Sequence, residues 1–160
     1  MSNSYLQFGK DSPESEALIA WWQKLDVNRG ERAELRRCGT PTEVVFTPAY
    51  HRLRHAVIRY GAVNDDNLAA IAGLVARVKI NAVESTIAEL MASGKGESAK
   101  ARVSGLRFRR LLKVKDQEEL FPALGRVIAL LGGAINLQSI AQSVYFWNDR
   151  TRKQWAFDYY

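Results

Sequence analysis

The sequence predicts an all-α protein whose length suits one domain or two small helical lobes. Apolar residues recur at spacings of three and four through most of the chain, which is the period of an amphipathic helix. Serine, threonine, asparagine or aspartate precedes several of these segments, where its side chain can cap a helix N-terminus. No segment alternates apolar and polar residues over a length that predicts a strand.

The first helix is expected over residues 13–26. Ser12 supplies the N-cap and Pro13 suits the first helical position, which needs no backbone N–H. The apolar face of this helix includes Trp21 and Trp22. Adjacent residues on a helix point about 100° apart, so we expect only one of the two indoles to be fully buried.

Two further helices follow in the N-terminal half. One covers about 30–38 and ends at Gly39, where glycine permits a left-handed exit. The other begins after Thr47 and continues to about residue 61.

A fourth helix begins after Asn64, which is followed by two aspartates that favour the positive end of the helix dipole. Its apolar residues continue to Ala82 and leave few polar positions, so we expect it to be the central core element.

The C-terminal part predicts four more helices. One covers about 100–114, the next begins at the Asp116 capping box and ends at two glycines, and Asn136 and Asp149 cap the last two. Ser93 to Ser98 break the helical pattern and predict a flexible connector over residues 93–99.

The composition excludes several classes of protein. A hydrophobic share of 47% is enough to build a core and is too high for a disordered chain. No run approaches the roughly 20 apolar residues that cross a bilayer, so we expect no membrane contact. A single cysteine, Cys38, can form neither an internal disulfide nor a cysteine-based zinc site, and residues 1–10 show no secretion signal. We therefore expect a cytoplasmic protein.

The basic residues are unevenly distributed along a chain of formal charge +6. Between residues 100 and 115 there are seven bases and no acid. Helical spacing aligns basic residues into three ridges, which are Arg102, Arg109 and Lys113; Arg29, Arg32 and Arg36; and Arg52, His55 and Arg59. A cationic ridge of this length matches a nucleic-acid backbone, which such contacts bind without reading sequence.

Each of these features also has a simpler structural explanation. A charged helix face is often only the solvated side, and Glu31 and Glu34 dilute the ridge over 30–38. The aromatic residues that crowd the C-terminus beside several bases could stack on single-stranded bases. Core packing is the more frequent role, and we expect it for most of them. Exposed arginines and aromatics also suit a helical adaptor that contacts only proteins.

Catalytic and metal-binding signals are weak. His51 and His55 would share a helix face, but two arginines lie beside them and no carboxylate follows until Asp65. Gly94-Lys95-Gly96 lacks the rest of a phosphate-binding loop. Most acids are explained as helix caps, which leaves no carboxylate cluster for two metals. We therefore expect no enzyme activity, no metal and no cofactor.

Several short motifs, in their order and spacing, resemble the CasB family, the small subunit of the type I-E CRISPR surveillance complex Cascade. The motifs are Trp21-Trp22-Gln-Lys-Leu25, Arg32-Ala-Glu-Leu35-Arg36-Arg37, Pro48-Ala-Tyr50-His-Arg52-Leu53, Gly105-Leu-Arg107-Phe-Arg109-Arg110-Leu111-Leu112, Arg126, and the stretch from Phe146-Trp147-Asn-Asp149-Arg150 to Trp155 and Tyr160.

The resemblance implies a compact bundle of two small helical lobes, with a variable N-terminal extension over residues 1–12, an N-terminal lobe over 13–92 and a C-terminal lobe over 100–160. It also implies a subunit that is present as a pair beside the guide RNA, binds DNA strands and stabilises the R-loop without catalysis of its own. The implied partners are the guide-RNA-containing Cascade subunits, the target and displaced DNA strands and a second copy of the chain. The phosphate contacts carried over from the family are Arg36, Arg37, Arg52, Arg107, Arg109, Arg110, Arg126 and Arg150. Periodicity alone adds Arg59, Arg102 and Lys113.

Overall fold

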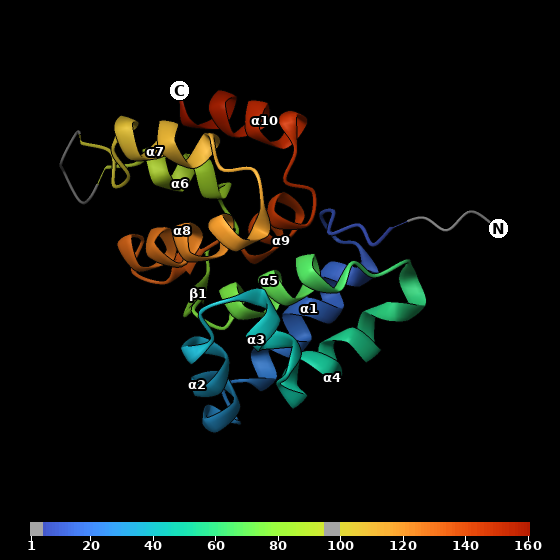
Figure 1. Cartoon of the computed structure of the whole chain (residues 1–160). Helices are drawn as coiled ribbons and strands as arrows, with labels where there is room; N and C mark the ends of the chain where they lie inside the picture. Colours follow the sequence, from blue (N-terminus) through green and yellow to red (C-terminus); the bar gives the residue numbers. More distant parts are fainter. Residues whose placement is uncertain (1–4, 95–99) are drawn as a thin grey trace.

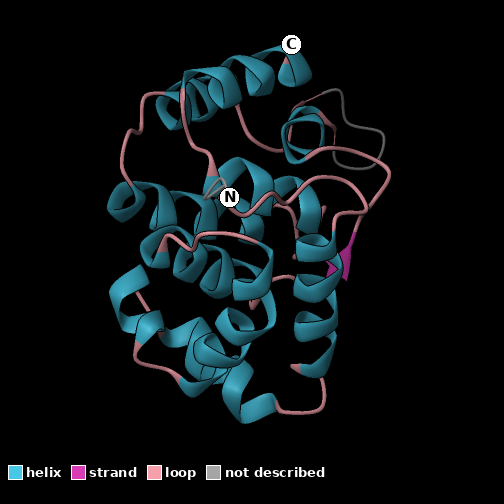
Figure 2. Ribbon diagram, turned by 90° about the vertical axis from the view of Figure 1, so that its right-hand side faces the viewer, coloured by secondary structure: helices cyan, strands magenta, loops and turns pink. Residues whose placement is uncertain are grey.

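The computed structural model describes residues 5–94 and 100–160, and within them it is mostly helical, which confirms the predicted all-α class (Figures 1 and 2). The α-helices are α1 (Pro13–Lys24), α2 (Arg29–Arg37), α3 (Pro41–Val45), α4 (Pro48–Val57), α5 (Asp65–Val75), α6 (Ile87–Ala92), α7 (Gly105–Leu112), α8 (Gln117–Leu130), α9 (Leu137–Tyr145) and α10 (Asp149–Tyr159). A 3₁₀ turn, η1 (Ile58–Tyr60), continues α4.

Side-chain caps begin all ten of these α-helices. In each one, a side-chain oxygen of the residue before the helix accepts a hydrogen bond from the backbone N–H of the third helical residue. The predicted caps Ser12, Thr47, Asn64 and Asn136 are confirmed. The predicted cap Asp149 is wrong, because its neighbour Asn148 occupies that position and Asp149 is the first helical residue.

The helix predicted beyond Asn64 is shorter than expected, because α5 ends at Val75. The chain then forms β1 (Ile80–Asn81), which pairs in parallel with β2 (Ala134–Ile135) in a two-stranded sheet. The backbone N–H groups of Lys79 and Ile80 both donate to the Gly133 carbonyl, so tertiary pairing replaces the helical ladder here.

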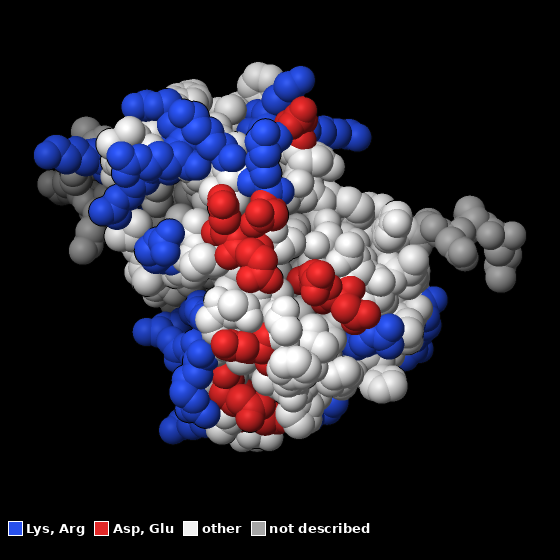
Figure 3. Space-filling model, viewed as in Figure 1, with Lys and Arg blue, Asp and Glu red and all other residues white. Residues whose placement is uncertain are grey.

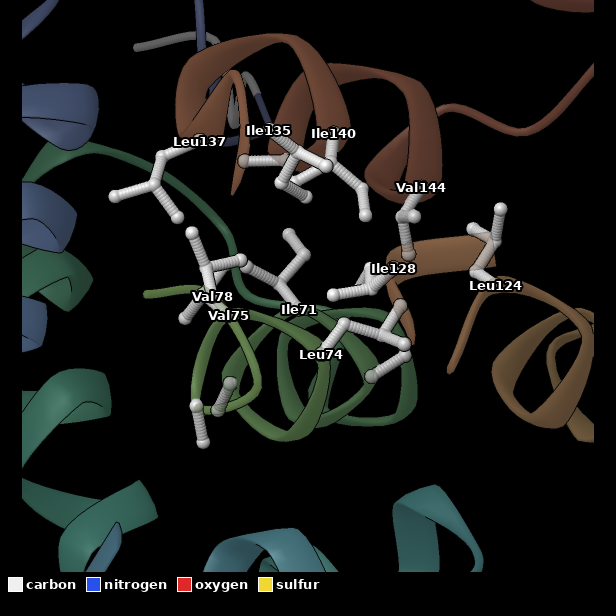
Figure 4. Packing of buried hydrophobic residues seen from close by; sticks show 14 of the residues in the cluster. Ile71, Leu74, Val75, Val78, Leu124, Ile128, Ile135, Leu137, Ile140 and Val144 are labelled. Atoms are coloured by element: carbon white, nitrogen blue, oxygen red, sulfur yellow. The ribbon is translucent and has the colours of Figure 1, made fainter. Parts of the chain in front are cut away.

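Helix α5 is the central core element, as predicted. Its residues from Leu68 to Val75 are all buried. It packs against α3, α8 and α9. Figure 4 shows Ile71, Leu74 and Val75 facing apolar side chains from α8, β2 and α9, among them Leu124, Ile128, Ile135, Ile140 and Val144.

Both indoles of the Trp21-Trp22 pair are buried, so the expectation that only one would be is wrong. Trp21 donates from Nε1 to the Ala49 carbonyl over 3.0 Å, and Trp22 donates to the Val78 carbonyl over 3.1 Å. Helix α1 therefore has one neighbour in α4 and another in the segment after α5, and each covers one indole.

The segment before α1 contributes to the core. Leu6 and Phe8 are both fully buried. The Phe8 backbone N–H donates to Gln142 Oε1 over 2.7 Å, and Tyr5 pairs with Ala62. One cluster of buried hydrophobic residues extends from this segment through both predicted lobes. Most of the expected connector, residues 95–99, lies outside the described residues.

Most C-terminal aromatic residues pack inside the fold, as expected. Trp155 is buried and donates from Nε1 to Ser143 Oγ over 2.8 Å. Tyr159 stacks on Phe108 with ring centroids 3.9 Å apart. Its hydroxyl donates to the Val103 carbonyl over 2.6 Å. Helix α10 thereby fixes α7, which carries three arginines and no acid.

Candidate nucleic-acid interface

Helix α7 presents three arginines to solvent because two of its apolar residues, Phe108 and Leu111, face inward. Phe108 and Leu111 are buried, whereas Arg107, Arg109 and Arg110 are exposed. No ion pair involves these three arginines in the described part of the chain. Figure 3 shows Lys and Arg side chains gathered over α7, with a band of Asp and Glu below them.

The predicted alignment of Arg102 with Arg109 and Lys113 is wrong. The expected helix over 100–114 begins only at Gly105, so Arg102 lies in the preceding loop. There its backbone N–H donates to the Ser93 carbonyl, and its Nε is buried without a hydrogen-bond partner among the described residues. Lys113 is exposed at the C-cap of α7, where a cation suits the helix dipole.

The structure brings two α7 arginines together with Arg126 of α8. Arg107, Arg110 and Arg126 line one cavity of about 360 Å³ between the two helices. The rest of its lining is aliphatic and comes from Val103, Leu111, Val114, Ala123, Val127 and Leu130. Sequence motifs had marked each arginine separately, but only the packing of α7 on α8 makes them neighbours.

A second cationic cavity lies between α2, the segment after α5 and the C-terminal end of α8. Arg36, Arg77 and Lys79 line it, and its volume is about 370 Å³. Gly132 and Gly133, both at positive φ, form the tight turn on its other side. The sequence patterns indicated Arg36 but did not single out Arg77 and Lys79. These two basic residues directly follow the apolar stretch of α5.

Arg77 is held by backbone carbonyls and has no carboxylate partner in the described residues. It donates to the carbonyls of Gly73, Arg36 and Cys38 at 2.6, 3.1 and 3.0 Å. Its guanidinium lies 5.1 Å from the ring centroid of Phe121. Burial lowers the pKa of Arg77. The charge nevertheless remains, because an arginine stays protonated in proteins.

Several other candidate arginines are neutralised or isolated. Arg52 forms an ion pair with Glu31, and Arg32 forms one with Asp26 at 2.6 Å, so the ridges on α2 and α4 are weaker than predicted. Arg59 lies in η1, over the ring of Tyr60. The two remaining candidates, Arg37 at the end of α2 and Arg150 on α10, are exposed.

Asp65 anchors a polar cluster beside α4. Its Oδ1 accepts hydrogen bonds from the Tyr50 hydroxyl at 2.5 Å and from Arg54 Nε at 2.8 Å. Burial opposes ionisation, but these two donors outweigh it and lower the pKa of Asp65. Burial and the same carboxylate raise the pKa of Tyr50. The cluster ties α4 to α5 and leaves Arg54 engaged.

The described residues form no metal-binding arrangement. They contain no group of three or more His, Cys, Asp or Glu side chains that could hold a metal ion. His51 Nε2 lies 2.7 Å from the Val45 carbonyl, and burial raises the pKa of the Cys38 thiol. No helix in residues 5–94 or 100–160 is long and apolar enough to cross a membrane.

The described residues thus define a small helical protein with arginines clustered on α7 and α8. The family model for CRISPR-associated protein Cse2 matches residues 31–160. The chain therefore belongs to the Cse2 family, which confirms the resemblance drawn from its motifs.

Two solved structures share the fold. One is a chain of E. coli Cascade bound to a PAM-containing double-stranded DNA target, with a TM-score of 0.73 and 21% identity, covering 93% of this chain and 95% of that one. The other is CasB from Thermus thermophilus, with a TM-score of 0.68 and 21% identity, covering 93% of this chain and 98% of that one. No curated protein matches the sequence.

Proposed function

We propose that the chain is a non-catalytic, nucleic-acid-binding subunit of a Cascade-type CRISPR ribonucleoprotein. Its family and the fold that it shares with a chain of DNA-bound Cascade support this proposal. It holds DNA and RNA backbones without reading their sequence. Its partners are the guide-RNA-containing subunits, the target and displaced DNA strands and a second copy of itself, in the cytoplasm.

The observation that carries the proposal is the group of exposed arginines on α7. Arg107, Arg109 and Arg110 lie on eight residues of helix, and the described structure gives them no carboxylate partner. Guanidinium groups bind phosphates through two parallel hydrogen bonds. Contacts of this kind fix a strand in place and carry no sequence information.

Backbone binding has a specific use in R-loop formation. The RNA–DNA heteroduplex is about as stable as the DNA duplex that it replaces, so a small additional contribution decides the direction of exchange. Fixed cations that hold a separated strand supply that contribution. Arg36, Arg77 and Lys79 provide a second group of cations, which line a cavity together with residues of α8.

The test is a mobility-shift titration of the full chain with several unrelated single-stranded and double-stranded DNA sequences. We expect similar affinities for all sequences of one kind, and a steep decline with salt. If each α7 arginine neutralises one phosphate, the triple variant Arg107→Glu/Arg109→Glu/Arg110→Glu flattens the slope of log Kobs against log salt by about 2 for a single strand.

A control separates local from overall charge. Lys10→Glu/Lys24→Glu/Val27→Glu lowers the formal charge of +6 by five units, against six for the α7 variant, at exposed positions away from α7. This variant should retain most of the affinity. The adaptor alternative predicts no retardation of DNA by the wild-type chain even at low salt. Equal losses in the two triple variants would contradict an interface on α7.

A further inference from the structure

The cavity between α7 and α8 is an apolar depression that nothing in the described chain fills. Its inner wall is formed by Val103, Leu111 and Val127, which are 1%, 5% and 6% exposed. Leu130 stands at the edge with 44% of its surface exposed. The volume of about 360 Å³ is in the lower part of the range of small-ligand sites, roughly 300–1,000 Å³. An occupant of this cavity is compact and apolar in its body.

The edge of the same cavity is strongly cationic. Arg107 and Arg110 stand on the α7 wall and Arg126 on the α8 wall. No acidic side chain lines the cavity among the described residues. The positive charge also continues beyond the cavity to Arg109 and Lys113 on the exposed face of α7. The occupant is therefore apolar in the middle and anionic on both sides, with further negative charge along its continuation.

We propose that this cavity receives one unpaired nucleobase of a bound single strand, while Arg107, Arg110 and Arg126 hold the phosphates that flank it. A nucleotide strand combines a flat base, whose two faces pack against apolar groups, with a charge on each side, which is the pattern of the cavity. Bases that leave a stack are held between apolar side chains in other proteins. The aliphatic lining cannot distinguish one base from another, so the site adds affinity without sequence specificity.

The competing occupant is an apolar side chain of an acidic protein segment. The run of cations past the cavity favours the nucleic acid, because its charges repeat at every nucleotide. The inference rests on the proposed function, since it names what the strand does at one point of the same surface. It adds a contribution from bases to an interface otherwise made of phosphate contacts.

The experiment compares two oligomers with the same number of phosphates, oligothymidylate and a strand of the same length made of abasic residues. Fluorescence anisotropy with the full chain gives the affinity for each. We expect oligothymidylate to bind at least about fivefold more tightly, which corresponds to about 1 kcal/mol for one held base. The salt slopes of the two oligomers should agree, because their phosphate contacts are the same.

Filling the cavity should remove that difference. Ala123→Leu places a larger side chain into open space on the α8 wall, and all three arginines remain. We expect it to lower affinity for oligothymidylate to that for the abasic strand, with the salt slope unchanged. Ala56→Leu is the matched control, because Ala56 is a half-buried alanine that lines a different cavity, between α1 and α4. It should leave the fivefold preference intact.

A second variant guards against misfolding of the first. Leu130→Ser changes the exposed edge of the cavity and should also reduce the preference for oligothymidylate. If the wild-type chain binds both oligomers equally, the base site is refuted, and the cavity is left to a protein partner while the proposed function stands. A preference that survives both variants also refutes this site. Failure to bind either oligomer at low salt refutes the proposed function as well.

Discussion

Replacing Gly73 with alanine should destabilise the protein, although alanine is the better helix former. Gly73 lies inside α5, where the helices pack closely. A Cβ at this position would lie 2.7 Å from two ring carbons of Phe121 and 3.0 Å from Val44 Cγ2. Phe121 and Val44 are 1% and 0% exposed, so neither side chain can move aside into solvent.

Two opposing effects set the size of the change. Alanine in a helix interior gains about 1 kcal/mol over glycine. Overpacking a buried site costs about 1–3 kcal/mol. The second effect is larger, and we expect the free energy of unfolding to fall by about 1 kcal/mol. For a chain of this size that corresponds to a decrease in Tm of about 2–4 °C.

Urea denaturation and thermal unfolding monitored by circular dichroism measure this change. The control is Gly125→Ala in α8, where a Cβ would meet Arg77 Nε only at an ordinary 3.7 Å. That substitution should stabilise the protein by up to about 1 kcal/mol. Gly73→Ala in a Phe121→Leu background should lose most of its cost. If Gly73→Ala raises the Tm as much as Gly125→Ala does, the close packing of α5 against α8 is refuted.

Two further predictions concern stability. Asp65→Asn should lower the free energy of unfolding at pH 7. The pKa of Asp65 is lower in the folded protein than in the unfolded chain, so its carboxylate stabilises the fold at pH values above the unfolded pKa. The difference from wild type should therefore shrink as the pH falls below about 4 and the carboxylate becomes protonated. Urea titrations between pH 3 and 7 test it, and a difference that does not depend on pH would contradict the Tyr50 and Arg54 contacts. Phe8→Ala should cost about 3–5 kcal/mol, since the ring is fully buried. Unchanged urea denaturation would show that the segment before α1 does not belong to the core.

Helix starts were the most predictable part of the fold, because the signal is local. A cap needs only one side chain and a backbone N–H a few residues later, and Ser12, Asn64 and Asn136 were recognised on that basis. Two helices were missed although their signals are present. Thr86 and Glu89 form a complete capping box for α6, and Thr40 caps α3 in front of a proline.

Helix ends and burial depended on contacts that sequence periodicity does not contain. The apolar residues after Val75 continue a helical pattern, yet the chain pairs there with β2, more than fifty residues away. Trp21 and Trp22 are both buried because α1 has a second neighbour, the segment after α5, which no local sequence pattern predicts. Leu6 and Phe8 were assigned to an extension because two apolar residues in isolation predict no element.

The candidate site also has one part that the sequence predicts and another that depends on tertiary packing. Exposed arginines on α7 follow from its amphipathic sequence, and Arg107, Arg109 and Arg110 face solvent in the structure. Their proximity to Arg126 depends on how α8 packs, as does the cavity of Arg36, Arg77 and Lys79. The sequence therefore identified cations and could not identify the cavities that they surround.

The placement of the acids explains how a chain of charge +6 keeps a cationic helix whose arginines have no ion-pair partner among the described residues. Acidic side chains are engaged where the fold needs acceptors: Glu14 accepts the Gln7 N–H, Glu43 the Gly39 N–H and Glu89 the Thr86 N–H. Helix α7 has no acid in its first turn. Instead it carries Arg107 there, against the helix dipole, with Arg110 one turn away.

Like charges one turn apart cost a few tenths of a kcal/mol, and a cation near a helix N-terminus costs a comparable amount. No carboxylate in the described structure offsets these costs, because Arg107 and Arg110 have no ion-pair partner there. An anion bound between α7 and α8 would relieve both at once. The arrangement therefore costs stability in the isolated chain and gains it when a phosphate is bound, so added polyanion should raise the Tm of the wild-type protein more than that of the α7 triple variant.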